Sequence, residues 1–303
     1  MSAGFHRFLL EHYPVLRQNH PTEGRRATRL LAADAFFSLD ASARAQYAAS
    51  PEPSDLDLAS SPSTLDPDPS DALLPQDADA DTPGIVVRTD FTNDDAWSEF
   101  IAALTASEHE FLSDAQPSDP PTANADDDDS SSEDEDEPST SASTSGLPLV
   151  APTPSLTFFT VLSSPPSLLN GLPNIALLRL LTSLTIRPAP APPPGTKRLR
   201  PNQQHRLIDL NGLQEIYTGR SVWVYDAQSN VDGAVRMVNL AGDANVYGTA
   251  TGDSWRVRAT HITEMQANIT FHGMKVDFGG LDRWDYAERV RNLEYVSRIA
   301  VLP

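Results

Sequence analysis

Three aspartates near residue 90 form the group in this chain that is best suited to bind a metal. Asp90, Asp94 and Asp95 follow an apolar run at residues 85–87. Their carboxylate oxygens could coordinate Mg²⁺, so a metal-dependent enzyme centred on them is one hypothesis for the function. The other hypothesis is structural, because Thr92 with Asp95 fits a capping box and acidic residues stabilise the first turn of a helix. We expect helix capping here, and neither a metal nor another cofactor.

The rest of the sequence offers no catalytic motif. It has no glycine-rich phosphate loop and no nucleophile elbow, and its histidines lack the spacing of a zinc-binding helix. His261 stands beside an expected helix start and could act as a general base, although a single histidine next to an apolar strand is more often structural. The sequence contains no cysteine, and hence no disulfide, thiolate metal site or cysteine nucleophile. We therefore predict that the chain is not an enzyme.

Arginines near the N-terminus are the candidates for contact with nucleic acid. Arg25, Arg26 and Arg29 are the best candidates to contact phosphates, and Arg7 and Arg17 precede them. Nearby acidic residues leave only a small excess of positive charge, whereas phosphate-binding surfaces are usually strongly basic. The resulting hypothesis is weak, non-sequence-specific DNA contact. The alternative is that these arginines form the solvated face of a small helical domain.

Three short helices are the elements that would position these arginines. Phe5 and Phe8 lie at i and i+3, which predicts the apolar face of a first helix that runs up to Pro14. A second helix should follow Pro21 and pack its last turn against Phe8. Asp40 should then cap a third helix.

The aromatic residues of this segment have a recognisable spacing. Phe36 is followed three residues on by Leu39, and Leu39 is followed eight residues on by Tyr47. This spacing resembles a degenerate HMG box, a small three-helix module known for bending DNA, in which Trp usually stands at the place of Phe36. The resemblance spans residues 5–47 and implies weak DNA contact or, alternatively, protein contacts alone. DNA-binding boxes carry many lysines and a long third helix, whereas this segment has no lysine and meets proline early. The implied core consists of Phe5, Phe8, Phe36, Leu39 and Tyr47.

Composition separates the parts of the chain that can fold from those that cannot. With 26 prolines and a net charge of −20, much of the 303-residue chain should be unable to bury a core. We expect a disordered linker at 51–83 and disordered insertions at 113–154 and 187–203. The first insertion carries an acidic tract, which could attract a basic protein partner. Ser130, Ser131 and Ser132 in this tract each precede an acidic residue by three positions, so they are candidates for phosphorylation.

A short basic cluster suggests where the protein acts. Lys197, Arg198 and Arg200 lie in the proline-rich insertion and resemble a minimal nuclear import signal. The longest apolar candidate for a membrane segment, at 175–186, contains Arg179 and is too short to span a bilayer. We expect an intracellular protein, in the nucleus or the cytoplasm with the nucleus favoured, that has no membrane partner and no small-molecule ligand.

Residues 84–303 are expected to form an α+β domain. A hairpin turn is predicted at Asp232 and Gly233, and a helix is predicted to end near Gly273. Residues 281–303 should close the domain as a helix followed by a strand. Apolar alternation predicts strands at 85–87, 156–162, 221–226, 234–240 and 255–259. Helical periodicity predicts helices after residue 92, at 168–184 and from residue 262 onward.

Two stretches of this domain carry a second resemblance. Thr89, Asp90 and Phe91 are followed by Trp97, and the later stretch contains Asn268, Ile269, Thr270, Met274, Val276 and Phe278. Both are similar to an uncharacterised family known from bacteria and fungi and described only as a domain of unknown function. The similarity covers residues 84–280 and implies a fold without any chemistry. We therefore expect a non-enzymatic binding or scaffold protein, or a module for protein–protein interaction only.

Overall fold

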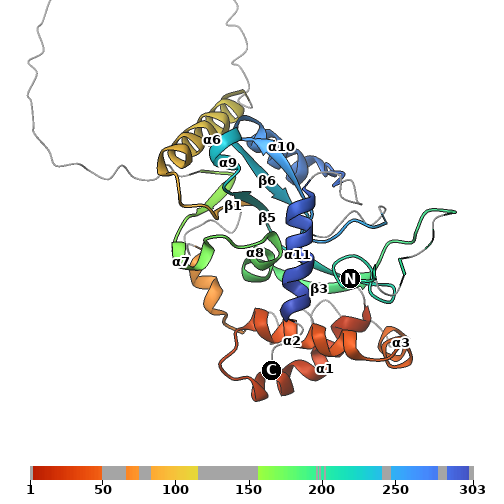
Figure 1. The fold of residues 1–303 in the computed structure, drawn as a ribbon. Coiled ribbons are helices and arrows are strands. Elements are labelled where there is room, and N and C mark those ends of the chain that lie inside the picture. The colour runs from red at the N-terminus through yellow and green to blue at the C-terminus, as the bar shows by residue number, and fades with distance from the viewer. Residues whose placement is uncertain are drawn as a thin grey trace, which may run out of the picture.

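The computed structural model describes residues 3–49, 66–74, 83–114, 156–195, 197, 199–200, 203–240, 247–278 and 285–299. Its centre is a mixed five-stranded sheet (Figure 1). The strands are β1 (Gly84–Arg88), β2 (Phe159–Leu162), β5 (Ser221–Tyr225), β6 (Ala234–Val238) and β7 (Ser254–Arg258). Their order is β2-β1-β5-β6-β7, with β1 parallel to both of its neighbours and the last two pairings antiparallel. The fold class is α+β, as predicted.

Strand β1 lies in the interior of the protein. Ile85, Val86 and Val87 are fully buried, because β1 has a strand on each side and helices over both faces. This is why the sequence shows an unbroken apolar run there, where a half-exposed strand would alternate. Val86 packs in the same buried cluster as residues of α6 (Asp94–Asp114) and α10 (Ala259–His272). Ile85 and Val87 face the opposite layer, which contains α8 (Asn174–Leu181), and α11 (Tyr286–Ile299) packs on α8.

A second, two-stranded sheet lies next to the N-terminal helices. It consists of β3 (Ser183–Pro188) and β4 (Leu213–Thr218), paired antiparallel. Helices α1 (Ala3–Asn19) and α2 (Arg25–Ser38) contact β3, and α3 (Ala41–Ala49) packs on α1. The rings of Phe5 and Phe8 meet the ring of Phe36 edge to face, with centroids 5.5 and 5.4 Å apart. Tyr47 meets Phe8 at 5.3 Å, and Leu39 packs against the same cluster.

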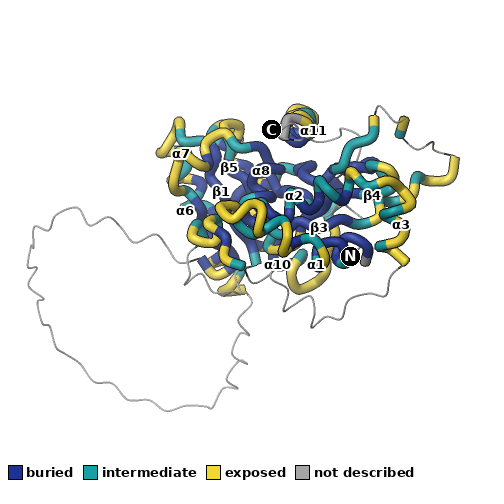
Figure 2. The backbone as a smooth tube through the Cα atoms, turned by 90° about the horizontal axis from the view of Figure 1, so that it is seen from below, coloured by how far each residue is buried: buried dark blue, intermediate teal, exposed yellow. Residues whose placement is uncertain are grey.

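The N-terminal helices share their hydrophobic core with the sheet. One cluster of buried apolar side chains includes Phe5 and Phe36 as well as Ile85. Figure 2 shows this interior in dark blue, running through β1, β5, α8 and α2, whereas α3 lies at the exposed periphery. The guanidinium of Arg29 is buried in the same contact and donates to the backbone oxygen of Leu184 in β3 at 2.8 Å. The described residues 3–49 therefore share one core with the sheet.

Part of the expected linker completes the N-terminal helices. Residues 66–74 contain a short 3-10 helix, η1 (Pro69–Leu73), and the hydroxyl of Tyr13 donates to Asp66 at 3.0 Å. Asp68 accepts from the backbone N–H of Arg26 at 2.6 Å, in the first turn of α2. Gly24 permits this approach, because a Cβ there would lie 2.7 Å from the Asp68 carboxylate. The prediction of a linker without structure was wrong for 66–74, since its carboxylate satisfies a helix end. Residues 51–65 and 75–82 lie outside the described residues.

Two predicted elements differ from those observed. The helix expected at 168–184 is divided into α7 (Pro166–Leu169) and α8, and it ends where β3 begins. Gly171, in the left-handed region at φ +68°, and Pro173 cause the break. The turn expected at Asp232 and Gly233 is preceded by a short helix, α9 (Ser229–Asp232), which Gly233 ends at φ +63°.

Element ends and insertions also differ from expectation. Helix α1 continues through Pro14 to its end at Asn19. The first insertion begins later than expected, because α6 reaches Asp114, and 115–154 lie outside the described residues. In the second, Arg187 and Pro188 belong to β3 and pair with Gln214 and Leu213. Helix α11 extends to Ile299, and the closing strand expected after it also lies outside the described residues.

A buried carboxylate joins three separate parts of this fold. Glu215 in β4 is fully buried and accepts from Arg179 of α8 at 3.1 Å and from the hydroxyl of Tyr217 at 2.5 Å. Its other oxygen pairs with Arg206, which also pairs with Asp34 of α2. Burial alone would raise the pKa of Glu215, but Arg206 and Arg179 outweigh it and lower this pKa to about 2.

We expect Glu215→Gln to destabilise the protein by about 3–5 kcal/mol at neutral pH, because it leaves the buried Arg179 without a counter-charge and removes one of the two carboxylates paired with Arg206. The pKa of Glu215 is depressed in the folded state, from 4.5 to about 2. Its contribution is therefore complete above pH 4.5 and is lost as the pH falls toward 2. Urea unfolding of both proteins across this range should show the stability difference shrinking with acid. The exposed Glu110→Gln is the control, and a difference that is constant with pH would contradict the assignment.

Candidate functional site

The N-terminal arginines are engaged in contacts within the chain. Four of the five that the sequence suggested for DNA contact form ion pairs with carboxylates. Three of those carboxylates, Asp66, Asp68 and Asp71, belong to residues 66–74, which cover the start of α2. The pairs are Arg7–Glu11 (3.0 Å), Arg17–Asp66 (3.5 Å), Arg25–Asp71 (3.1 Å), Arg26–Asp68 (3.1 Å) and Arg26–Asp71 (2.8 Å). Their charge is thus largely neutralised locally.

The observed position of Arg29 differs most clearly from what the sequence predicted. Arg29 was expected to contact phosphate, but its side chain is buried between α2 and β3 and donates to Leu184 through both Nε and Nη2. Burial, with a smaller effect of Arg25, lowers the pKa of Arg29 to about 10. The residue lies on the inner side of α2, which the periodicity of alanines and leucines around it could have indicated. It is a structural cation in this fold.

The aspartates near residue 90 form a turn and do not converge on a common point. Arg88 donates to Asp94 at 2.7 Å, and its guanidinium lies over the rings of Phe91 and Trp97, 4.8 and 5.2 Å from their centroids. These contacts explain the residues that gave the second resemblance: they fix the entry into α6. Within the described residues, no three His, Asp or Glu side chains are grouped so that they could hold a metal.

The prediction that a side chain caps the helix at this turn was correct, but the capping residue is not the one predicted. The cap of α6 is Asn93, whose Oδ1 accepts from the N–H of Ala96 at 3.0 Å. Thr92 instead donates its hydroxyl to Asp90 at 2.5 Å. Asp90 also accepts from Asn230 at 2.7 Å. Burial would raise the pKa of Asp90, but the bonds from Thr92 and Asn230 and the charge of Arg88 lower it.

A polar cleft of about 610 Å³ lies where β1 and β5 end. Thr89 and Asp226, which directly follow these parallel strands, both line it. In open sheets with parallel strands, ligands often bind at the carboxyl ends of the strands. The usual place is beside a strand whose neighbours in the sheet lie on opposite sides of it, where the order of the strands reverses. β1 is such a strand, because β2 and β5 lie on either side of it. The position is therefore a natural one to search for a ligand site.

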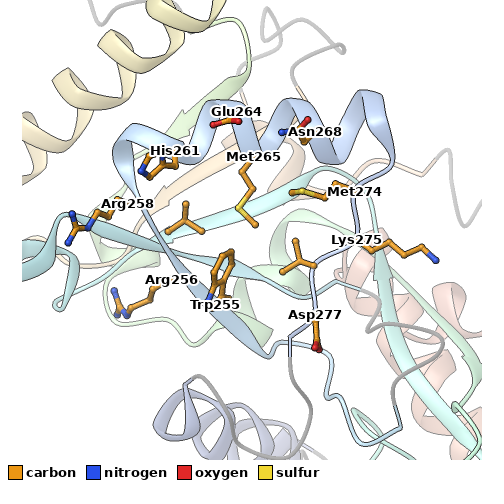
Figure 3. A pocket seen from close by; sticks show the side chains of 12 residues that line it. Trp255, Arg256, Arg258, His261, Glu264, Met265, Asn268, Met274, Lys275 and Asp277 are labelled. Carbon is orange, nitrogen blue, oxygen red and sulfur yellow. The ribbon is translucent and has the colours of Figure 1, made fainter.

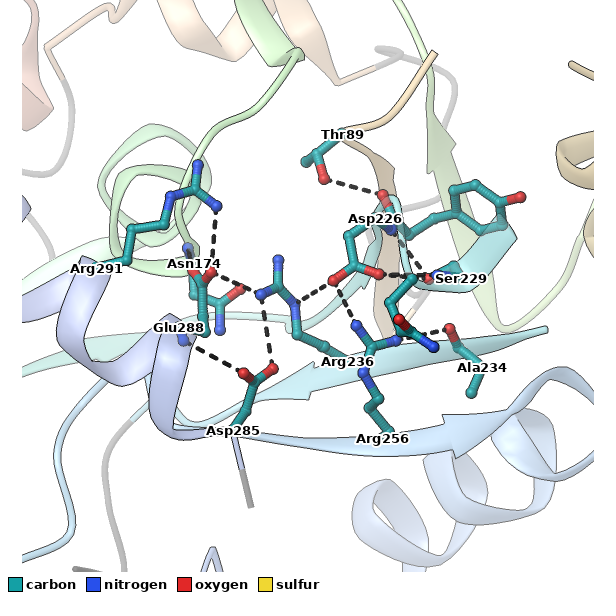
Figure 4. A network of polar contacts seen from close by, with 12 residues as sticks. Thr89, Asn174, Asp226, Ser229, Ala234, Arg236, Arg256, Asp285, Glu288 and Arg291 are labelled. Atoms are coloured by element: carbon teal, nitrogen blue, oxygen red, sulfur yellow. Dashed lines mark hydrogen bonds and ion pairs between the residues drawn. The ribbon is translucent and has the colours of Figure 1, made fainter. Parts of the chain in front are cut away.

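The charged groups in this cleft are already paired with one another (Figure 4). Arg236, buried on β6, lies 3.3 Å from Asp226, 3.7 Å from Asp285 and 2.7 Å from Glu288. Arg256 donates to Asp226 at 2.5 Å, and burial of Asp226 is outweighed by its arginines, which lower its pKa. Asp285 and Glu288 belong to the start of α11. The network thus fastens α11 to the sheet and uses the groups that a ligand would need.

A groove of about 680 Å³ lies on the other side of β7 (Figure 3). Its walls are β7, the exposed side of α10 and the segment 274–277. Met265 on α10 and Met274 after it point into the groove, which also exposes part of Trp255. Two of the four methionines of the chain line this surface. Methionine adapts its shape to different apolar partners and is common at surfaces that bind peptides.

The outer edge of β7 is unpaired within the part of the chain that the structure describes. β7 is the last strand of the sheet order and pairs with β6 alone. The N–H of Asn239 donates to Asp253 and the N–H of Ala259 donates to Gly233, so odd-numbered residues of this stretch bond to β6. Because hydrogen-bonding direction alternates along a strand, the backbone N–H and C=O of Arg256 and the N–H of Arg258 point outward, whereas the C=O of Arg258 belongs to the first turn of α10. The groove therefore includes free backbone donors and acceptors as well as an apolar floor.

The sequence predicted the strand and the helix that form the groove, but it did not predict the groove. It predicted a strand at Trp255 and Val257 and a helix that ends at Gly273, and the structure has both as β7 and α10. His261, considered as a base, is exposed on the groove and has no carboxylate contact among the described residues. The one available signal was Met265 and Met274 on either side of that helix end.

The remaining candidate residues carry no site in the described part of the chain. Lys197 and Arg200 are exposed, and the backbone N–H of Arg200 bonds to Gln203 at 3.4 Å. Arg198, Ser130, Ser131 and Ser132 lie outside the described residues.

No protein-family model, curated protein or solved structure matches this chain significantly. The molecule is therefore characterised by its own geometry: an α+β protein with a polar cleft whose charges are paired with one another and an apolar groove beside β7. None of the helices described is long and apolar enough to cross a membrane.

Replacing Arg29 should affect stability and leave DNA affinity unchanged. We expect Arg29→Gln to cost about 1–3 kcal/mol, because it leaves the buried oxygen of Leu184 without its donor. The exposed Arg7→Gln should change stability by less than about 0.5 kcal/mol. Thermal unfolding measures the first effect, and fluorescence anisotropy with duplex DNA over a salt series measures the second. If Arg29→Gln lost DNA affinity while its stability stayed unchanged, the structural interpretation of Arg29 would be wrong and a phosphate-binding role would be supported.

Proposed function

We propose that this chain is a non-enzymatic binding protein whose groove beside β7 receives an extended segment of another protein. The observation that carries the proposal is the unpaired outer edge of β7 next to an apolar floor. A peptide strand that joins such an edge gains backbone hydrogen bonds, while pockets for alternate side chains give specificity. Both elements are present in one surface here.

The apolar floor would supply most of the affinity. Met265, Met274 and Trp255 are each partly or largely solvent-exposed, so a bound segment would remove their surface from water. Exposed apolar residues in a contiguous patch indicate an interaction site more strongly than single ones do. Phe271, at the end of the same helix, is 66% exposed but does not line the groove, and its ring meets that of Phe158.

The rival hypotheses have less support in the geometry. DNA contact through the N-terminal module would rely on arginines that are paired with carboxylates or buried. A metal-dependent reaction would need Asp90 and Asp94 to face a common ion, whereas they bond to Asn230 and Arg88. The groove supports the remaining hypothesis, a protein-interaction module.

Arg258 allows the backbone edge to be tested separately from its side chain. Its φ is −70°, which proline adopts without strain, and its N–H points away from β6. Arg258→Pro should therefore fold, yet it removes the outward donor and places a ring in the path of a docking strand. Arg258→Ala is the matched control, because it removes the same charge and keeps the N–H.

The measurement is binding of the full chain to an array of nine-residue peptides in which apolar residues alternate with serine or threonine. We expect the wild type and Arg258→Ala to bind a common subset, and Arg258→Pro to bind it at least about tenfold more weakly. Thermal unfolding should show the two variants to be similarly stable. Equal binding by both variants would exclude edge docking, and an array on which the wild type binds nothing would refute the proposed function.

A further inference from the structure

The charges around the groove point to the chemistry of its partner, an inference that rests on the proposed function. We infer that the segment bound beside β7 is acidic, with Asp or Glu side chains next to its apolar residues. Arg258, at the end of β7, and Lys275, on the facing segment, are both exposed. Figure 3 shows them on opposite sides of the apolar floor. A segment that crosses the floor would pass close to both.

These two cations are available to a partner. Neither Arg258 nor Lys275 has a hydrogen bond or ion pair to another described residue, whereas Arg256 is held by Asp226. The chain as a whole carries a net charge of −20. The two cations on opposite sides of this groove therefore contrast with the rest of the molecule. Complementary charge raises the rate of association and rejects wrong partners, which suits a site whose floor is chemically unselective.

The remaining charges restrict where the partner's carboxylates can lie. Glu264 is exposed on the α10 side of the groove, and Asp277 is exposed on the facing segment, two residues after Lys275. Beyond Glu264, Glu110 and Asp114 at the end of α6 line an adjoining hollow together with His261. Carboxylates of the partner would be repelled on this side. They should therefore face the ends of the groove at Arg258 and Lys275, which gives the bound segment a preferred register.

The test compares three peptide sets with the same apolar pattern and with Glu, Ser or Lys at every intervening position. Anisotropy of labelled peptides is measured with the full chain at low and high salt. We expect the Glu set to bind about tenfold more tightly than the Lys set at low salt, with the difference shrinking as salt screens the charges. The double variant Arg258→Glu, Lys275→Glu should reverse this order.

A matched control separates local from overall charge. Lys197→Glu, Arg200→Glu changes the net charge by the same amount at two exposed cations that do not line the groove. It should keep the preference for the Glu set. Equal binding of the Glu, Ser and Lys sets would overturn the acidic partner and leave the proposed function standing. Loss of the preference in the control would also overturn it, because long-range charge would then be the cause. Failure of all three sets to bind would refute both.

Discussion

The buried carboxylate of Glu215 is the interaction on which the arrangement of this protein depends. Taking one carboxylate and two guanidinium groups out of water is costly, and only their mutual contacts offset that cost. Those contacts require α8, the β3–β4 sheet and, through the second partner of Arg206, helix α2 to meet at one point. An apolar core tolerates small shifts of its elements, whereas this group of charges fixes their relative positions. These charges explain why the N-terminal helices pack against the sheet as part of one core.

A second group of charges does the same on the opposite side of the molecule. Arg236 joins Asp226 at the end of β5 to Asp285 and Glu288 at the start of α11. The backbone N–H of Asn174 in α8 donates to the same Glu288 at 2.7 Å. A site of this shape and position in a sheet is often where ligands bind, yet here its charges serve to hold a helix. Among the described residues, β7 is one of the two edge strands of the sheet, and its outer edge has unused bonding capacity.

The sequence was informative where local physics decides structure. The buried run at 85–87, the aromatic spacing of Phe5, Phe8 and Phe36 and the glycine that ends α10 all act over a few residues, and each corresponds to an observed feature. The sequence was uninformative where contacts between distant segments decide the structure. Nothing in the spacing of Arg29 shows that Leu184, 155 residues away, supplies its acceptor. The groove is a property of three elements together, so neither its edge nor its free cations could be located from the chain alone.

The unpaired edge of β7 also bears on how the protein avoids joining to itself. Two copies that met edge to edge in antiparallel orientation would extend the sheet from five strands to ten, the first step of uncontrolled association. In a pairing centred on Arg256, its guanidinium would meet its own symmetry mate, because residues directly opposite on one face are close neighbours. This like-charge contact would disfavour a second copy at the edge while leaving it accessible to the single strand that we propose.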